Sequence, residues 1–182
     1  MSATTPGWTT AGPRVFATPR LVVDELVEAD APFILELLTD PAFLRYIGDR
    51  GVQDLEGARR YVEAGPRASY AAHGYGLWRV ALRDGGTPIG ICGVLKRPTL
   101  PEPDLGFAFL PAYRGCGYAF EAARATLAHA RDGLGLGRIL AITTRDNVDS
   151  IALLGRLGFR DEGEVEGAPG GAPLRLFAHE PG

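Results

Sequence analysis

The segment Arg114-Gly115-Cys116-Gly117-Tyr118-Ala119 has the residue types and the position of a phosphate-binding loop. It follows a strand-like run, 105–110, and opens an alanine-rich helical segment, so it contains first-turn N–H groups that have no partners inside the helix. The peptide dipoles make that end of the helix partly positive, and Gly115 and Gly117 lack the Cβ that would hold an anion away. The spacing therefore predicts a site for a phosphate group.

Two arginines near this loop, Arg114 and Arg124, could add positive charge, because a guanidinium presents paired donors to phosphate oxygens. An ordinary glycine-rich turn between a strand and a helix is the alternative interpretation. The loop lacks the Gly-Lys-Ser/Thr ending of a P-loop and the third glycine of the dinucleotide fingerprint. Those two classes of nucleotide site are therefore not favoured.

Composition limits the class of protein further. The chain has 182 residues, enough for one domain, and its formal net charge of −3 does not suggest nucleic-acid binding. The two cysteines, Cys92 and Cys116, make no disulfide framework, and the three histidines have no metal-ligand spacing. No apolar run is long enough to span a bilayer, and no leader pattern is present. We expect a cytoplasmic protein without a metal site and without nucleic-acid or membrane partners.

The periodicity of apolar residues predicts a central sheet with helices packed on it. Residues 1–17, rich in Thr, Pro and Gly, are expected to be a flexible tail, and residues 18–182 one domain. Asp40-Pro41 and Gly65-Pro66 are expected to interrupt helices. The predicted strands are 20–26, 77–82, 88–95, 104–110, 138–143, 159–166 and 174–179. The predicted helices are 30–38, 54–64 with a short continuation to 72, the loop's helix to about 131, and one that Asp146 or Asn147 caps and Gly158 ends.

A series of short motifs then follows in a definite order along the chain: Thr18-Pro19-Arg20-Leu21, Gly65-Pro66, Ser69-Tyr70, Gly74-Tyr75-Gly76-Leu77, Ile89-Gly90, Cys92-Gly93, Asp104-Leu105-Gly106-Phe107, Arg114-x-x-Gly117-x-Ala119, Glu121-Ala122-Ala123-Arg124, Asn147-x-x-Ser150 and Leu157-Gly158-Phe159. With these motifs, residues from about 18 to 179 resemble the GNAT superfamily of acyl-CoA-dependent N-acetyltransferases, within its ribosomal-protein-alanine-acetyltransferase-like branch. One motif alone would say little, whereas the ordered series is specific.

The resemblance implies an α/β (α+β) fold. Its sheet is mixed and mostly antiparallel, has helices on both faces, and is splayed between strands 104–110 and 138–143, with acetyl-CoA in the gap. The pyrophosphate would lie on the loop residues Arg114, Gly115, Cys116, Gly117, Tyr118 and Ala119. The pantetheine amides would pair with the backbone near Phe109 and Leu110, much as an added strand does. Asn147 would contact the far side of the CoA arm, and a helix N-cap is its alternative role.

Acyl transfer from a thioester to an amine raises two questions of proton transfer. At pH 7 an ε-amine is neutral in about one molecule in a thousand and an α-amine in about one in ten, so a base is optional for an α-amine. Asp104 is the candidate base, directly or through water, and a structural carboxylate at a strand start, beside Glu102, is the alternative. Ser150 or an ordered water is the candidate donor to the leaving sulfur, because Leu154 stands where many members have a tyrosine. Alternatively, Ser150 bonds its own helix backbone.

Other polar residues are given structural roles. Glu121 favours the positive end of the loop's helix, and Cys116 is not favoured as a nucleophile because direct attack by the amine needs none. Acceptor choice is expected to rest on residues 40–72 and on the hairpin 167–173. The large side chains expected there as shape elements are Tyr46, Arg50, Tyr70 and Trp78.

The sequence therefore predicts an acetyl-CoA-dependent N-acetyltransferase, monomeric or homodimeric. Its acceptor would be a primary amine, either a protein N-terminal α-amine or a small-molecule amine, that attacks directly in a ternary complex. The alternative is a non-catalytic acyl-CoA-binding sensor or interaction module. Gly117→Glu is expected to weaken CoA binding by at least about tenfold, or about 1.4 kcal/mol, because it places bulk and negative charge on the loop.

Overall fold

Eight strands form one sheet within residues 11–182, the part of the chain that the computed structural model describes. The strands are β1 Arg14–Ala17, β2 Leu21–Asp24, β3 Leu77–Leu82, β4 Pro88–Leu95, β5 Asp104–Phe109, β6 Ile139–Thr143, β7 Arg160–Val165 and β8 Leu174–His179. Their order across the sheet is β1-β2-β3-β4-β5-β6-β8-β7, and the pairs are antiparallel except for β5 and β6. The expectation of a mixed, mostly antiparallel sheet is confirmed.

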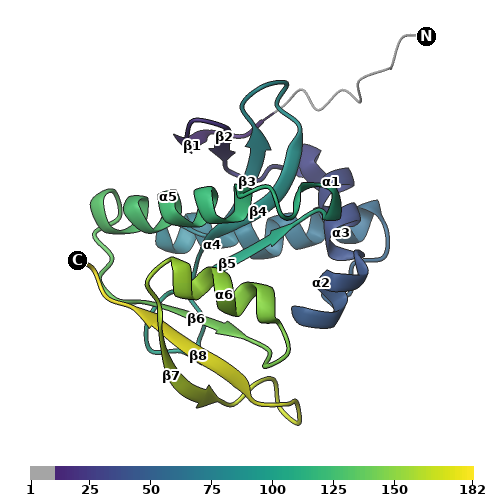
Figure 1. Ribbon diagram of the computed structural model, residues 1–182. Coiled ribbons are helices and arrows are strands. Elements are labelled where there is room, and N and C mark those ends of the chain that lie inside the picture. The colour runs from purple at the N-terminus through teal and green to yellow at the C-terminus, as the bar shows by residue number, and fades with distance from the viewer. Residues whose placement is uncertain (1–10) are drawn as a thin grey trace.

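Helices cover both faces of the sheet, as expected. They are α1 Ala31–Leu38, α2 Pro41–Tyr46, α3 Leu55–Val62, α4 Ala68–His73, α5 Tyr118–Asp132 and α6 Val148–Arg156, with the shorter segments η1 Glu28–Asp30, η2 Glu63–Arg67 and η3 Pro111–Tyr113. Figure 1 shows α5 and α6 in front of the sheet and α3 and α4 behind it.

Apolar side chains at helical spacing attach the helices to the sheet. On one face, α5 buries small residues such as Ala122, Ala123 and Ala130, which let this helix approach the strands closely. On the opposite face, α1 buries a stripe that includes Phe33 and Leu37. Each large apolar side chain buried in this way contributes about 1.5–3 kcal/mol of transfer free energy.

The first strand, β1, corrects the expected extent of the N-terminal tail. The sequence predicts a tail over residues 1–17, but Arg14–Ala17 pair with β2, with Ala17 opposite Val22. Val15 and Phe16 pack against the core, and the ring of Phe16 lies edge-on to Trp78. The prediction is wrong for this strand because two apolar side chains gain burial by adding to the sheet edge. The rest of the predicted tail, residues 1–10, lies outside the described residues.

Asp40 and Pro41 begin a helix where the sequence pattern predicts only an interruption. The side chain of Asp40 accepts hydrogen bonds from the backbone N–H groups of Ala42 and Phe43, both at 3.2 Å. Pro41 takes the first helical position, where its missing N–H would have no partner in any case. The result is the helix α2, which Phe43 anchors in the core.

The Gly65-Pro66 pair also departs from the prediction. The sequence predicts a break here, but the chain stays helical from α3 through η2 to α4. The segment η2 is a π-helix that contains Pro66, and its wider turn accommodates a residue that has no N–H to donate. The helix ends only at Gly74, which has a positive φ of 77°.

The parallel pair β5 and β6 is joined at one end only. The one register pair between them is Asp104 with Leu140, and Leu140 also donates its N–H to the Pro103 carbonyl at 2.9 Å. From this joint the two strands diverge toward their carboxyl ends, as Figure 1 shows. The sheet is therefore splayed between these two strands, as the sequence resemblance implies.

Candidate functional site

The loop between β5 and α5 has the geometry of an anion site. Gly115 and Gly117 have φ values of 72° and 81°, in the left-handed region that favours glycine, and Gly117 is the N-cap of α5. Within the described residues, the backbone N–H groups of residues 115–119 donate to no protein acceptor. The loop is exposed, so these donors are available to a ligand.

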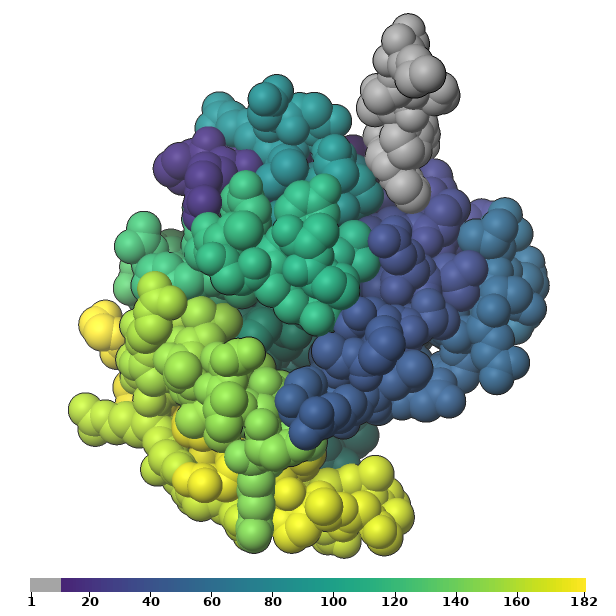
Figure 2. Space-filling model, turned by 45° about the vertical axis from the view of Figure 1, so that its right-hand side comes forward, coloured from purple at the N-terminus to yellow at the C-terminus, as the bar shows by residue number. Residues whose placement is uncertain are grey.

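The loop borders a hollow on the surface of the molecule. Figure 2 shows this hollow between the green atoms of the β5–α5 connection, the lime atoms of α6 and the dark blue atoms of α2. The diverging ends of β5 and β6 lie at its base, because the loop continues from β5 and α6 follows β6. This hollow is the candidate active-site cleft.

Hydrogen-bond alternation along β5 decides which backbone groups face the cleft. Leu110 donates its N–H to the Ile89 carbonyl of β4 at 2.9 Å, so its donor is already used. In an antiparallel pair successive residues point their backbone groups to opposite sides, and Phe109 and Phe107 therefore direct theirs away from β4. Of the two residues predicted for pantetheine, only Phe109 offers its N–H to the cleft. Sequence reasoning missed Phe107, which the period of two could have identified.

Arg114 is held by two groups at the mouth of the cleft. Its Nε donates to the Phe109 carbonyl at 3.0 Å, and its Nη2 donates to the carboxylate of Asp40 at 2.7 Å. Burial alone would raise the pKa of Asp40, but the hydrogen bonds from Arg114 and from the α2 backbone hold it below its usual value. The guanidinium of Arg114 thus orients β5 and α2 relative to each other, while its backbone belongs to the loop.

Glu121, in the first turn of α5, has the structural role that was predicted. Its carboxylate accepts hydrogen bonds from the Thr18 hydroxyl at 2.6 Å and from Arg20 Nε at 2.6 Å. Arg20 also donates from Nη1 to the Cys116 carbonyl at 3.0 Å and lies over the Tyr118 ring. Burial would raise the pKa of Glu121, but these hydrogen bonds outweigh burial and lower it. The turn before β2 is thereby attached to the loop.

Asp104, the candidate base, is enclosed at the joined end of the cleft. Its side chain is 1% exposed, and Arg97 Nε donates to both carboxylate oxygens, at 2.9 and 3.0 Å. Burial raises the pKa of Asp104, although the charge of Arg97 acts in the opposite direction. Phe109 lies five positions further along the extended strand, roughly 16 Å from Asp104. The ion pair with Arg97 favours a structural role for this carboxylate over the role of catalytic base.

The first turn of α6 presents the other predicted residues. Asn147 caps the helix by accepting a hydrogen bond from the Ser150 N–H at 3.3 Å, which leaves its amide nitrogen available as a donor. The half-buried Ser150 hydroxyl bonds to no other described residue, so the alternative of a bond to its own helix is not observed. Leu154 is 2% exposed and belongs to the core.

The two cysteines differ sharply. Cys92 is buried beside Thr126, and burial raises the pKa of its thiol to about 12. Cys116 is exposed in the loop. Within residues 11–182, no three His, Cys, Asp or Glu side chains are grouped so that they could hold a metal ion. None of the described helices combines the length and apolar character needed to cross a bilayer.

Two of the residues expected at the acceptor end pack in or against the core instead. Trp78 is 2% exposed and packs in the core. The Tyr70 hydroxyl accepts from the Leu26 N–H and donates to the Leu77 carbonyl, and burial raises the pKa of Tyr70. Both predictions are corrected, because an aromatic residue at a helix–sheet contact gains more from burial than from lining a cleft.

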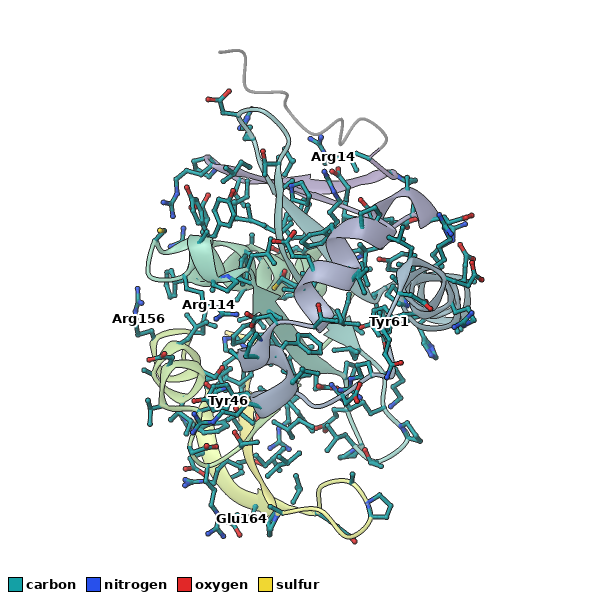
Figure 3. All side chains as sticks on the ribbon, turned by 90° about the vertical axis from the view of Figure 1, so that its right-hand side faces the viewer. Arg14, Tyr46, Tyr61, Arg114, Arg156 and Glu164 are labelled. Atoms are coloured by element: carbon teal, nitrogen blue, oxygen red, sulfur yellow. The ribbon has the colours of Figure 1, made fainter. Side chains whose placement is uncertain are left out.

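The C-terminal end of α2 does reach the cleft. Arg45 of α2 pairs with Asp146, next to the α6 cap, at 3.1 Å, and its guanidinium lies over the Tyr46 ring. Figure 3 shows Tyr46 on α2 near α6. The structure therefore brings α2 and the start of α6, 101 positions apart at Arg45 and Asp146, together at the rim of one cleft, with α2 on the side expected for the acceptor.

Comparisons with known proteins agree with this architecture. Residues 20–160 match the family model described as acetyltransferase (GNAT) domain. The N-acetyltransferase YnaD of Bacillus subtilis (strain 168), itself uncharacterised, is 30% identical over 148 residues, 80% of this chain and 82% of that protein. An acetyltransferase from Agrobacterium tumefaciens str. C58 has a TM-score of 0.79 at 24% identity, covering 97% of this chain and 99% of that one. A ribosomal-protein-S5-alanine acetyltransferase from Vibrio fischeri has 0.74 at 19%, covering 91% and 95%.

The splayed sheet and the glycine-rich loop beside it, together with these matches, define an acyltransferase. The chain belongs to the GNAT family of acetyltransferases, whose fold uses acetyl-CoA. The residues present fit that molecule, because the loop offers unpaired N–H donors and β5 offers an open strand edge beside them.

Proposed function

We propose that this enzyme transfers an acetyl group from acetyl-CoA to a primary amine by direct attack in a ternary complex. The observation that carries this proposal is the run of unpartnered N–H groups at residues 115–119, beside the open edge of β5. These are the two kinds of donor that a diphosphate and an amide-containing arm need. They lie in the order in which the two groups occur along CoA.

Each part of the cleft has a distinct binding role. The loop N–H groups hold the diphosphate, and the backbone of Phe107 and the N–H of Phe109 pair with the pantetheine amides. The free amide nitrogen of Asn147 donates from the α6 side. Because main-chain groups make most of these contacts, most side chains in the cleft do not contact the cofactor.

Acetyl-CoA supplies an activated acyl group as a thioester. The amine nitrogen forms a bond to the carbonyl carbon, the carbon–sulfur bond breaks, and the electron pair goes to sulfur. The amine loses one proton and the thiolate gains one. Ser150 donates to the departing sulfur, because its hydroxyl bonds to no other described residue and Asn147 holds the backbone of that turn. Water accepts the proton from the amine, and much of the rate comes from positioning.

The acceptor class follows from the pairing of Asp104, because within residues 11–182 no other carboxylate belongs to β5. Asp104 is paired with Arg97, so an acceptor that is substantially neutral at pH 7 is favoured. An α-amine is neutral in about one molecule in ten, against about one in a thousand for a lysine side chain. The resemblance in fold to proteins named as ribosomal-protein acetyltransferases also supports a protein or peptide α-amine.

Incubation with acetyl-CoA and a panel of acceptors tests this function. The panel contains peptides with free N-termini, their lysine-only counterparts with blocked N-termini, polyamines and small aminated molecules. CoA formation is measured by chromatography, because the exposed Cys116 would itself react with thiol reagents. Turnover is expected with free N-terminal peptides above the acceptor-free control. CoA binding without turnover on any acceptor would contradict the proposal and support a non-catalytic acyl-CoA sensor.

A matched pair of loop variants tests the binding site. Gly115→Glu and Gly115→Gln have the same size and the same strain at positive φ, and an added Cβ at Gly115 meets nothing within 4 Å. They differ only in charge. CoA should bind the Glu variant at least about tenfold more weakly than the Gln variant. Equal affinities in the two variants would place the diphosphate elsewhere.

A further inference from the structure

Most arginines of this protein are paired with carboxylates, but two that lie close to the loop are not. Arg124 of α5 and Arg156 of α6 form no ion pair with any described residue. Both guanidinium carbons instead lie over the ring of Phe120, at 5.8 Å and 4.5 Å from its centroid. Arg131, further toward the C-terminal end of α5, makes two hydrogen bonds to Asp132. The Arg124–Arg156 pair is therefore distinctive.

The pair is placed where a ligand held by the loop would continue. Arg124 lies seven residues beyond Gly117, about 10 Å along the axis of α5. Arg156 extends from α6 at the surface on the side of α5, as Figure 3 shows. Phe120 stands between the loop and Arg124 on the same helix, and its ring holds both guanidinium groups by cation–π contact. Two helices thus present a positive charge to the same aromatic ring.

A cavity continues from Arg124 away from the loop. It measures about 260 Å³, and its wall includes the apolar side chains of Leu127 on α5, Ile139 on β6 and Leu157 at the end of α6. Arg124 is the residue of its α5 wall nearest the loop in sequence. A flat apolar base and an anion could therefore be bound side by side, on the same face as the diphosphate.

We propose that Arg124 and Arg156 bind the 3′-phosphate on the ribose of CoA. This inference rests on the proposed function, because it assumes that the loop holds the diphosphate. Two guanidinium groups without carboxylate partners match a phosphate monoester, which carries more charge than each phosphate of the diphosphate. The pair makes the enzyme selective for CoA over the same molecule without its 3′-phosphate.

Calorimetric titration with CoA and with 3′-dephospho-CoA tests the proposal. The unmodified protein should bind CoA at least about tenfold more tightly, a difference of about 1.4 kcal/mol. In the double variant R124A/R156A, CoA affinity should fall to the level of 3′-dephospho-CoA, whose own affinity stays within about twofold. Each single variant should lose part of the discrimination. Arg60→Ala is the control, because Arg60 is an exposed arginine of α3, on the opposite face of the sheet, and should change neither affinity.

The possible results separate this inference from the function on which it rests. Equal affinity of the unmodified protein for the two ligands would overturn the 3′-phosphate site and leave CoA binding intact. Discrimination that survives in R124A/R156A would also overturn it. Failure of both ligands to bind would overturn the proposed function and this inference together. High salt should reduce the discrimination in the unmodified protein, because exposed charges are screened, and should have little effect on the ratio in the double variant.

Discussion

Arg20 donates from Nε to the Glu121 carboxylate at 2.6 Å, and this pair joins the turn before β2 to the first turn of α5. The same guanidinium donates to the Cys116 carbonyl within the loop. The N–H groups of this loop make no hydrogen bonds within the loop that would fix its conformation. We therefore expect the hydrogen bond from Arg20 to Cys116 to set the direction of the loop amides. The two motifs, Thr18-Pro19-Arg20-Leu21 and Glu121-Ala122-Ala123-Arg124, thus meet at one place.

Removal of the Arg20 contact should affect the cofactor more than the chemical step. In Arg20→Ala, the KM for acetyl-CoA should rise about three- to tenfold, or about 0.6–1.4 kcal/mol, while kcat changes by less than about twofold. Steady-state kinetics at varied acetyl-CoA measures both. Arg67→Ala is the matched control, because Arg67 pairs with Glu63 in a helix on the other face. A fall in kcat alone would contradict a positioning role.

The lowered pKa of Glu121 predicts a pH dependence of stability. A carboxyl whose pKa is lower in the folded state stabilises the fold above its unfolded pKa, about 4.3, and loses that contribution as pH falls through its folded pKa. The difference in unfolding free energy between the unmodified protein and Glu121→Gln should therefore be largest above about pH 5 and shrink in more acid solution. Urea unfolding at several pH values measures this. A difference that grows toward acid would contradict the assignment.

Thiol chemistry should distinguish the two cysteines. Iodoacetamide should modify Cys116 in the folded protein and spare Cys92, which is buried with a pKa raised to about 12. Because the added group stands on the loop, alkylation should weaken CoA binding by about tenfold or more, and saturating CoA should slow the reaction. Mass spectrometry locates the modified residue, and Cys116→Ser is the control. Unchanged modification of Cys116 in saturating CoA would be evidence against ligand binding at the loop.

Asp104→Asn should reveal whether this carboxylate takes part in the reaction. If its role is to pair with Arg97, the variant should lose about 1–3 kcal/mol of stability, while kcat with an α-amine peptide changes by less than about threefold. The pH profile of kcat should keep its shape. Loss of its acid limb, together with a large fall in kcat, would instead identify Asp104 as the base.

Ser150→Ala should slow the chemical step modestly. The leaving thiol has a pKa near 8.5, so protonation by Ser150 is expected to contribute about tenfold to kcat, with KM for acetyl-CoA nearly unchanged. Ser150→Thr keeps the hydroxyl and should retain most of the activity. Equal kcat for the Ala variant and the unmodified enzyme would transfer the role of donor to water.

Local patterns in the sequence identified the elements and the loop. Alternation and helical periodicity depend on neighbouring residues, so the positions of strands such as 77–82 and of the helix after Gly117 could be predicted from spacing alone. The role of Glu121 at a positive helix end was predictable for the same reason. Capping by Asp40 and the π-helical passage through Pro66 were not predicted, because each depends on how the backbone packs against the sheet.

What the sequence alone determined is therefore the order of elements, the glycine-rich loop and the family to which the chain belongs. The tertiary structure alone decided which charges are paired and which backbone groups are open. Arg97 pairs with Asp104, Leu110 donates its N–H to β4, and Arg124 and Arg156 both lie over the ring of Phe120. Such outcomes depend on distances between residues far apart in the chain, and short-range spacing carries no information about those distances.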